Sequence, residues 1–129
     1  MDYVVVDTNI ASLGVKRELP PRLLDRAPIV TFVTVGELIK WAETRSWGER
    51  RRGTLDHWLS QRVIIHGDEG IARTWGRIAA AAARRGRPSP DNDTWIAACC
   101  LALQLPLATR NVKDFADFVT HEGLRLIEA

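Results

Sequence analysis

Short apolar segments alternate with longer segments of helical periodicity along this chain. Strands are predicted at five short runs, most of them rich in β-branched residues: Tyr3–Val6, Ile29–Val33, Val63–Ile65, Leu107–Ala108 and Leu124–Ile127. Short apolar runs of this kind are typical of parallel strands that are buried on both faces. Their alternation with helices predicts an α/β fold, in which a central, mostly parallel sheet of about five strands is flanked by helices.

The helices are marked by their ends as well as by their periodicity. Thr34 and Glu37 have the spacing of a T-x-x-E capping box, which predicts that Thr34 caps a helix with Glu37 at its third position. Further helices are predicted over residues 48–60, 68–85 and 92–104, the last ended by Pro106. No repeat, low-complexity tract or long linker interrupts this pattern, so we expect a single domain over residues 1–129.

Composition indicates the cellular compartment of the protein more than its function. The chain is 46% hydrophobic and 26% charged, as in ordinary globular proteins, and its formal net charge of +2 neither requires nor excludes a nucleic-acid partner. Cys99 and Cys100 are adjacent and cannot form an ordinary disulfide, so we expect a reducing, cytoplasmic setting. The sequence shows no signal-peptide pattern and no apolar run long enough for a membrane span, so we expect neither secretion nor membrane insertion.

Four carboxylates each follow a predicted strand or lie in the first turn of a predicted helix: Asp7, Glu37, Asp93 and Asp114. Ligands of open α/β sheets bind beyond the carboxyl ends of the strands, so these four acids could converge on one crevice. Mg²⁺ and Mn²⁺ prefer such hard oxygen ligands, and a bound ion can polarise a phosphoryl oxygen and help to generate hydroxide. The joint pattern therefore favours a divalent-metal site.

Each acid also has a purely structural explanation. Asp7 could cap the helix that follows it, and Glu37 could be only the acid of the capping box. Asp93, like Asp91 before it, could be an ordinary residue of a first helical turn, and Asp114 could cap a short turn at Phe115. For any one acid taken alone, capping is the better explanation.

Four segments together resemble the PIN-domain family, and within it the toxins of bacterial VapBC toxin–antitoxin pairs. In chain order they are Val4-Val5-Val6-Asp7-Thr8-Asn9, Thr34-Val35-Gly36-Glu37-Leu38, Arg85-Gly86-Arg87-Pro88 leading into Asp93-Thr94-Trp95-Ile96-Ala97-Ala98, and Thr109-Arg110-Asn111-Val112-Lys113-Asp114-Phe115. The resemblance covers nearly the whole chain. It implies that the four acids bind the metal and catalyse, with Thr8 and Asn111 as polar neighbours that orient a ligand or a water.

The sequence departs from the family pattern at three places. Trp95 stands where the family commonly has a smaller aliphatic residue, and a glycine often found after the second acid is missing from residues 39–42. Asp91 lies two residues before Asp93, so either could face the metal; the spacing of Asp93 to Ile96 is that of the family. No departure removes an acid, which favours an active enzyme.

The resemblance further implies an endoribonuclease that cuts structured RNA, such as tRNA or rRNA, through a water activated by Mg²⁺ or Mn²⁺. It also implies a homodimer and a cognate antitoxin bound over the site. Arg87, Arg110 and Lys113 adjoin the predicted site acids, which suggests contacts with RNA phosphates. The arginines at 50–52 and 84–85 are explained equally well as a solvated helix face and a helix end.

Other functions are weaker on the same residues. Phosphatase and receiver domains usually carry a second aspartate near the first, and here Thr8 and Asn9 follow Asp7. The chain has neither a Gly-rich phosphate loop nor a G-x-S-x-G motif. The alternative that stays open is an inert PIN-like module that binds RNA or protein. Trp58 and Trp75 are expected to pack on apolar helix faces, which explains their presence without a functional role.

Overall fold

The computed structural model describes residues 2–129 and is built on a five-stranded sheet in the order β3-β2-β1-β4-β5. The strands are β1 (Asp2–Val6), β2 (Arg26–Thr31), β3 (Val63–Ile65), β4 (Leu107–Thr109) and β5 (Leu126–Glu128). All four neighbouring pairs are parallel. The predicted α/β class is confirmed.

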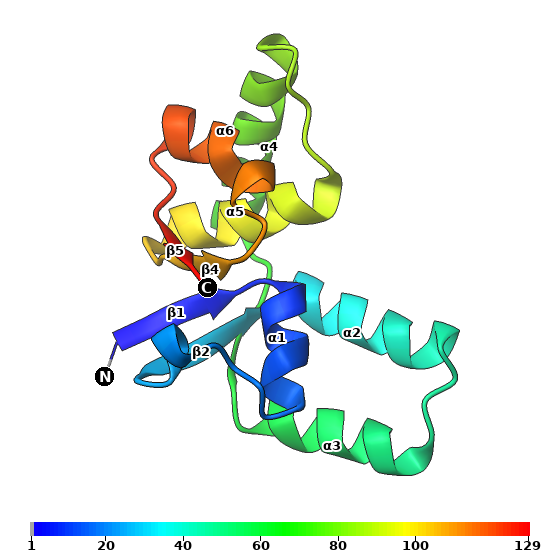
Figure 1. The fold of residues 1–129 in the computed structure, drawn as a ribbon. Coiled ribbons are helices and arrows are strands. Elements are labelled where there is room, and N and C mark those ends of the chain that lie inside the picture. Colours follow the sequence, from blue (N-terminus) through cyan, green and yellow to red (C-terminus); the bar gives the residue numbers. More distant parts are fainter. Residues whose placement is uncertain (1) are drawn as a thin grey trace.

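Helices cover both faces of this sheet. They are α1 (Thr8–Val15), the short 3-10 helix η1 (Pro21–Leu23), α2 (Phe32–Thr44), α3 (Glu49–Ser60), α4 (Glu69–Arg84), α5 (Asp91–Leu103) and α6 (Val112–Glu122). Figure 1 shows α1, α2 and α3 on one side of the sheet and α4, α5 and α6 on the other. Between residues 2 and 129, no helix combines the length and the apolar character that crossing a bilayer requires.

Side-chain alternation along the central strand links two hydrophobic cores. Val4 and Val6 pack into the core shared with α1, α2 and α3, whereas Val5 packs into the core beneath α4, α5 and α6. All three valines have no exposed surface. Burial on both faces explains why this strand is an uninterrupted apolar run, as expected for parallel sheets between helices.

The predicted start of α2 is wrong by three residues. The helix begins at Phe32, and its N-cap is Thr31, whose Oγ1 accepts a hydrogen bond of 3.2 Å from the Thr34 backbone N–H. Strand β2 correspondingly covers Arg26–Thr31 instead of Ile29–Val33. Glu37 therefore lies in the second turn and is not a capping-box acid, so the structural explanation for its presence is removed.

The C-terminal region also differs from expectation. No helix was predicted after Asn111, and a short turn at Phe115 was only an alternative explanation for Asp114; the structure has a full helix there, α6, whose Phe115 and Phe118 are buried one turn apart in the core. Because α6 ends at Gly123 in a left-handed conformation, strand β5 starts only at Leu126, later than predicted. The other helices lie within a residue or two of their predicted bounds, for example Asp91–Leu103 for the helix expected over 92–104.

The contact between α1 and α3 yields a stability prediction. A Cβ atom at Gly14 would lie 2.7 Å from Cζ2 of Trp58, closer than carbon atoms can approach. We expect Gly14→Ala to lower the free energy of unfolding by about 1–2 kcal/mol through overpacking. Gly76→Ala in α4, where a Cβ meets no neighbour, should instead raise it by up to about 1 kcal/mol. Urea unfolding measures both; equal effects would contradict the close packing.

Candidate active site

The strand order reverses between β1 and β4, and this is where a doubly wound sheet opens its ligand crevice. Asp7 follows the last residue of β1, and Thr109 is the last residue of β4. The Thr109 hydroxyl donates a hydrogen bond of 2.5 Å to Oδ2 of Asp7, and the Asp7 backbone N–H donates to the Ala108 carbonyl at 3.3 Å. The first predicted acid is thus fixed at the switch point.

Asp7 is both a helix cap and an acid of the crevice. Its Oδ1 accepts a hydrogen bond of 2.9 Å from the backbone N–H of Ile10 in α1, and its side chain is almost fully buried. Burial raises the pKa of Asp7, hydrogen bonds from Thr109, Ile10 and Asn9 oppose the rise, and the charge of Glu37 adds to it. Each carboxylate oxygen has a second lone pair, so capping leaves Asp7 able to bind a cation.

Glu37 is oriented by threonine hydroxyls. Thr8 Oγ1 donates to Oε1 of Glu37 at 2.7 Å and lies 3.1 Å from Oγ1 of Thr34. Because Thr8 has one hydroxyl proton, Thr34 is the donor in the second bond. These bonds connect the start of α1 with α2 and hold the Glu37 carboxylate beside Asp7. Thr8, predicted to be a supporting residue, lies against one of the site acids.

Asp93 completes the central group from α5. Burial, followed by the charges of Asp114, Glu37 and Asp7, raises its pKa to about 6. Charges act on one another in this way only over short distances, so the four predicted acids share one region. Asp91 is exposed and, two residues earlier in the helix, points about 200° away from Asp93. Of the two candidates, Asp93 is the one that faces the other acids.

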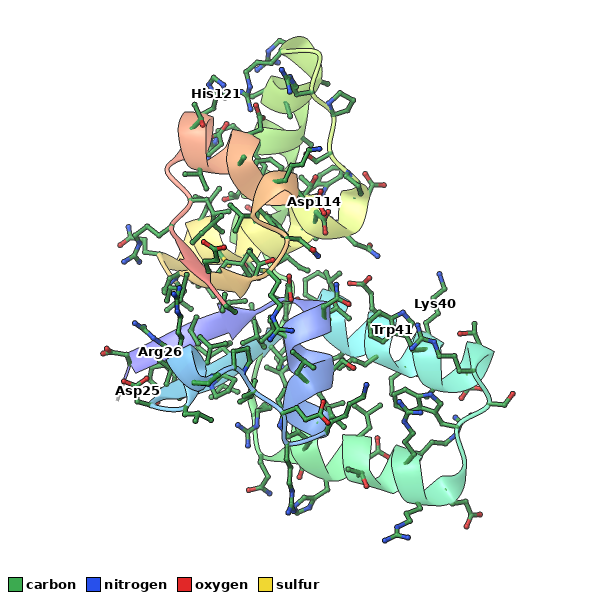
Figure 2. The ribbon with its side chains drawn as sticks, in the orientation of Figure 1. Asp25, Arg26, Lys40, Trp41, Asp114 and His121 are labelled. Atoms are coloured by element: carbon green, nitrogen blue, oxygen red, sulfur yellow. The ribbon has the colours of Figure 1, made fainter. Side chains whose placement is uncertain are left out.

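The α6 side of the crevice is more open. Asp114 lies in the first turn of α6 and is exposed; Figure 2 shows it where α6 starts beside α5. The Asn111 side chain does not cap this helix, but its backbone N–H donates to Oγ1 of Thr109 at 2.9 Å. The Asn111 backbone therefore acts on the site through Thr109.

Thr109 is the site residue that the sequence analysis missed. Its hydroxyl accepts from Asn111 and donates to Asp7, so it joins the end of β4 to the end of β1. It has no exposed surface. A signal was present, since a hydroxyl residue that ends a buried strand and opens the fourth family-like segment needs a polar partner.

The donor chemistry fits Mg²⁺ or Mn²⁺. All the clustered groups are carboxylate or hydroxyl oxygens. Burial is the main cause of the raised pKa values of Asp7 and Asp93, the charges of neighbouring carboxylates add to it, and a cation would relieve that repulsion. Among residues 2–129, no group of three or more His, Cys, Asp or Glu side chains is placed so that it could hold a metal ion by itself. Mg²⁺ commonly binds through one or two carboxylates and keeps several waters.

The three basic residues predicted to contact RNA do not all line the same groove. Arg87 and Lys113 line a groove of about 710 Å³ together with Asp114. Arg110 lines a separate hollow of about 320 Å³ at α1 and α2, with Asn9 and Arg45. Arg87 and Lys113 therefore share a groove with a site acid, and Arg110 lines a different hollow.

A nucleophilic cysteine is disfavoured by the structure. Cys99 and Cys100 are free and buried in α5. Burial raises the pKa of Cys99 to about 11, so its thiolate is scarce at neutral pH. The chemistry of the site therefore rests on the carboxylates.

Asp93 yields a pH-dependent stability prediction for the metal-free protein. Its pKa is about 6 when folded and near 3.8 when unfolded, so the folded state binds the extra proton between these values. The free energy of unfolding therefore falls as pH rises through this window and stays lower above it. We expect Asp93→Asn to raise the Tm in chelator by roughly 3–6 °C at pH 7.5 and not at pH 3.

Asp91→Asn is the matched control for this measurement. Asp91 is exposed in the first turn of α5, where its charge favourably faces the helix dipole. Its replacement should leave the Tm at pH 7.5 unchanged or slightly lower. Equal responses of the two variants would mean that Asp93 is not in a repulsive cluster.

Comparison with known proteins agrees with this geometry. The family model described as PIN domain matches residues 4–119. The chain is 35% identical over 119 residues to ribonuclease VapC1 of Haemophilus influenzae, covering 86% of this chain and 88% of that protein. It is 29% identical over 117 residues to the tRNA(fMet)-specific endonuclease VapC of Shigella flexneri, with the same coverage.

A solved structure agrees over almost the whole length. The DNA-bound VapBC of Salmonella typhimurium contains a chain that superposes with a TM-score of 0.83 at 25% identity, covering 98% of each chain. The segments that carry the sequence resemblance fall at the end of β1 and the start of α1, in the first two turns of α2, between α4 and α5 and in the first turns of α5, and at the end of β4 and the start of α6. The chain belongs to the PIN-domain family, among the ribonucleases of the VapC type.

Proposed function

We propose that this chain is a Mg²⁺- or Mn²⁺-dependent endoribonuclease, the toxin of a type II toxin–antitoxin pair, and that it acts in the cytoplasm on structured RNA. The observation that carries the proposal is the convergence of Asp7, Glu37, Asp93 and Asp114 at the switch point. Beyond the effect of burial, the charge of Glu37 adds to the rise in the pKa of Asp7, and the charges of Asp114, Glu37 and Asp7 add to the rise in the pKa of Asp93. A catalytically inert domain would gain nothing from the repulsion between these carboxylates. Relatives named as ribonuclease and as tRNA-specific endonuclease support RNA, and tRNA in particular, as the substrate.

The chain's own groups have distinct tasks in this proposal. When bound, the metal would polarise the phosphate and lower the pKa of a water, which favours phosphodiester hydrolysis, in which the P–O bond to the water replaces the P–O bond to the leaving oxygen and a proton of the water ends on that oxygen. Asp7 and Glu37 would hold the ion, and each is oriented beforehand by a hydroxyl, from Thr109 and Thr8 respectively. Asp93 and Asp114 would complete the acidic set from α5 and α6. Such orientation in advance favours catalysis because little reorganisation is needed during the reaction.

The assembly is proposed on the same basis. The similar Salmonella typhimurium chain is part of a VapBC complex, which supports a cognate antitoxin as the partner here. We also propose that residues 1–129 form a single domain and that the active form is a homodimer of this domain. An antitoxin that covers the switch point would inhibit by excluding RNA from the carboxylates.

The nuclease proposal predicts metal-dependent cleavage that requires the clustered acids. Purified protein without antitoxin should cut cellular tRNA or rRNA at discrete sites with Mg²⁺ or Mn²⁺, and not in chelator. Asp93→Asn should reduce the cleavage rate at least 100-fold, because it removes one charge of the site. Gel analysis with mapping of the new ends measures both. Asp91→Asn, two residues away and exposed, should keep near-normal activity.

Cleavage that persists in chelator or in Asp93→Asn would contradict the metal mechanism. A folded protein that binds RNA without cutting any of it would instead favour the inert PIN-like module.

The groove beside Asp114 predicts where RNA phosphates bind. Arg87→Gln and Lys113→Gln should each weaken RNA binding at all sequences and reduce the salt slope of log K by about 0.7–0.9. Arg84→Gln is the control, because Arg84 is exposed at the end of α4 but does not line this groove. Filter binding at several salt concentrations measures the slopes, and equal slopes for the three variants would exclude the groove as the phosphate path.

A further inference from the structure

A second hollow adjoins the acidic crevice on the side of α2 and α5. Its volume is about 340 Å³, and its lining includes the aromatic rings of Phe32 and Trp95. Polar groups reach it from both helices, namely Lys40 of α2 and Asn92 of α5. The size lies at the lower end for pockets that bind small organic groups. No step of the proposed hydrolysis uses these residues.

The aromatic wall of this hollow is held rigidly. Trp95 stacks on Trp75 of α4 with ring centroids 4.9 Å apart and planes 15° from parallel. Phe32 meets Trp95 edge-on, with centroids 5.9 Å apart and an interplanar angle of 70°. Trp75 covers one face of the Trp95 indole, and Trp95 also contributes to the lining of the hollow. Fixed aromatic surface of this kind suits a flat, apolar-faced ligand.

The polar groups suit a ligand with hydrogen-bonding edges. The Asn92 amide offers two donor hydrogens and an acceptor oxygen, the set that reads the edge of a nucleobase. Lys40 offers a cation for a base carbonyl or a phosphate. Figure 2 shows Lys40 extending from α2 on the side of that helix nearer to α5 and Asp114. Asn92 and Lys40 are both exposed and free to meet a ligand.

Glu37 joins the hollow to the catalytic crevice. It lines the hollow and is also the carboxylate that Thr8 orients beside Asp7. A ligand in the hollow would therefore lie next to the proposed metal site. In an RNA strand, a nucleobase is the flat group nearest to a phosphate, and unpaired bases are commonly recognised by stacking on aromatic side chains.

We propose that the hollow between α2 and α5 binds an unpaired nucleobase that flanks the scissile phosphate, with Trp95 and Phe32 stacking on the base and Asn92 reading its edge. This inference rests on the proposed ribonuclease function and specifies its substrate: a loop or bulge whose flanking base is turned out of the stack. Cleavage-site choice would then be set partly at this pocket.

Gly36 allows the hollow to be filled without removing any of its walls. It lies in α2, it lines the hollow, and a Cβ built there meets no atom within 4 Å. Gly36→Leu should therefore fold and place its side chain in the hollow. Gly76→Leu in α4 is the matched control, because this glycine is also helical with open space beyond it and does not line the hollow.

The experiment compares these proteins on a synthetic RNA hairpin carrying the mapped cleavage site. Two further hairpins lack the base of the nucleotide on one or the other side of the scissile phosphate. For the wild type and Gly76→Leu, we expect kcat/KM to fall about tenfold when one particular flanking base is missing, within the range of a lost base–aromatic stack. Gly36→Leu should be about tenfold slower on the intact hairpin and should no longer distinguish the base-free hairpin.

A second variant tests the reading of the base edge independently. Asn92→Ala removes only an exposed amide, and we expect it to narrow the differences in kcat/KM among hairpins with each of the four bases at that position. Mn²⁺ affinity, measured by calorimetry, should be the same for Asn92→Ala, Gly36→Leu and the wild type, which separates this pocket from the metal site.

Several outcomes would overturn the inference. The first is that Gly36→Leu and Asn92→Ala both keep the wild-type differences in kcat/KM among the hairpins. The second is that the wild type cuts all the hairpins equally well, whichever flanking base is missing. The third is that the wild type is a dimer by sedimentation and Gly36→Leu is not. The last would show that a second copy covers the hollow. If the wild type cuts no RNA in Mg²⁺ or Mn²⁺, the proposed function fails together with this inference. If it cuts with base-independent rates, only this inference fails.

Discussion

The hydrogen bond between Thr109 and Asp7 joins the ends of β1 and β4, the two neighbouring strands between which the strand order reverses. The arrangement of the site depends on that junction. Thr109 has no exposed surface and Asp7 is almost fully buried, so each polar group needs a partner, and each supplies the other's. This bond fixes Asp7 relative to β4. The other carboxylate oxygen of Asp7 accepts from the Ile10 backbone N–H and so fixes the start of α1. A substitution of either residue would leave a buried polar atom without its partner and disturb both halves of the sheet.

The remaining acids are brought to this junction by the connections of the sheet. Glu37 arrives on the helix that follows β2, Asp93 on the helix that precedes β4, and Asp114 on the helix that follows β4. Each is therefore held by an element that packs into one of the two cores. Burial is the main cause of the raised pKa values of Asp7 and Asp93, and the charges of the neighbouring carboxylates add to it, so the assembled acids also destabilise one another. The apolar packing on both faces of the sheet offsets this cost, and a bound cation would remove much of it.

The fold class and the four acids could be predicted because they follow from local signals. Uninterrupted β-branched runs indicate buried parallel strands, and each acid lies at a strand end or within the first two turns of a helix. The start of α2 was predicted wrongly because Thr31 and Thr34 both satisfy the local preference for an N-cap, and only tertiary packing selects Thr31. Helix α6 was missed because its apolar pattern is short, and its Phe115 and Phe118 gain their burial from α4 and α5.

Contacts between residues that are far apart in the chain could not be predicted from the sequence. The partnership of Thr109 with Asp7 spans 102 positions, and that of Thr8 with Glu37 spans 29. Arg110 lies on the connection from β4 to α6 and Lys113 at the start of that helix, yet they line different hollows, and which hollow each side chain lines depends on the packing around it. The aromatic stack of Trp75 on Trp95 joins two helices whose packing no single segment reveals. Helix periodicity could place Trp75 on an apolar face, as predicted, but not its ring against another.

The most direct test of the account is to locate a bound Mn²⁺ ion by anomalous scattering in crystals of the metal-loaded protein. The account predicts a peak at the junction of β1 and β4, bonded to the carboxylate of Asp7 and within reach, directly or through a water, of Asp93. A peak only at a distant surface site, or none at an Mn²⁺ concentration that saturates activity, would contradict the claim that the switch-point carboxylates are the metal centre.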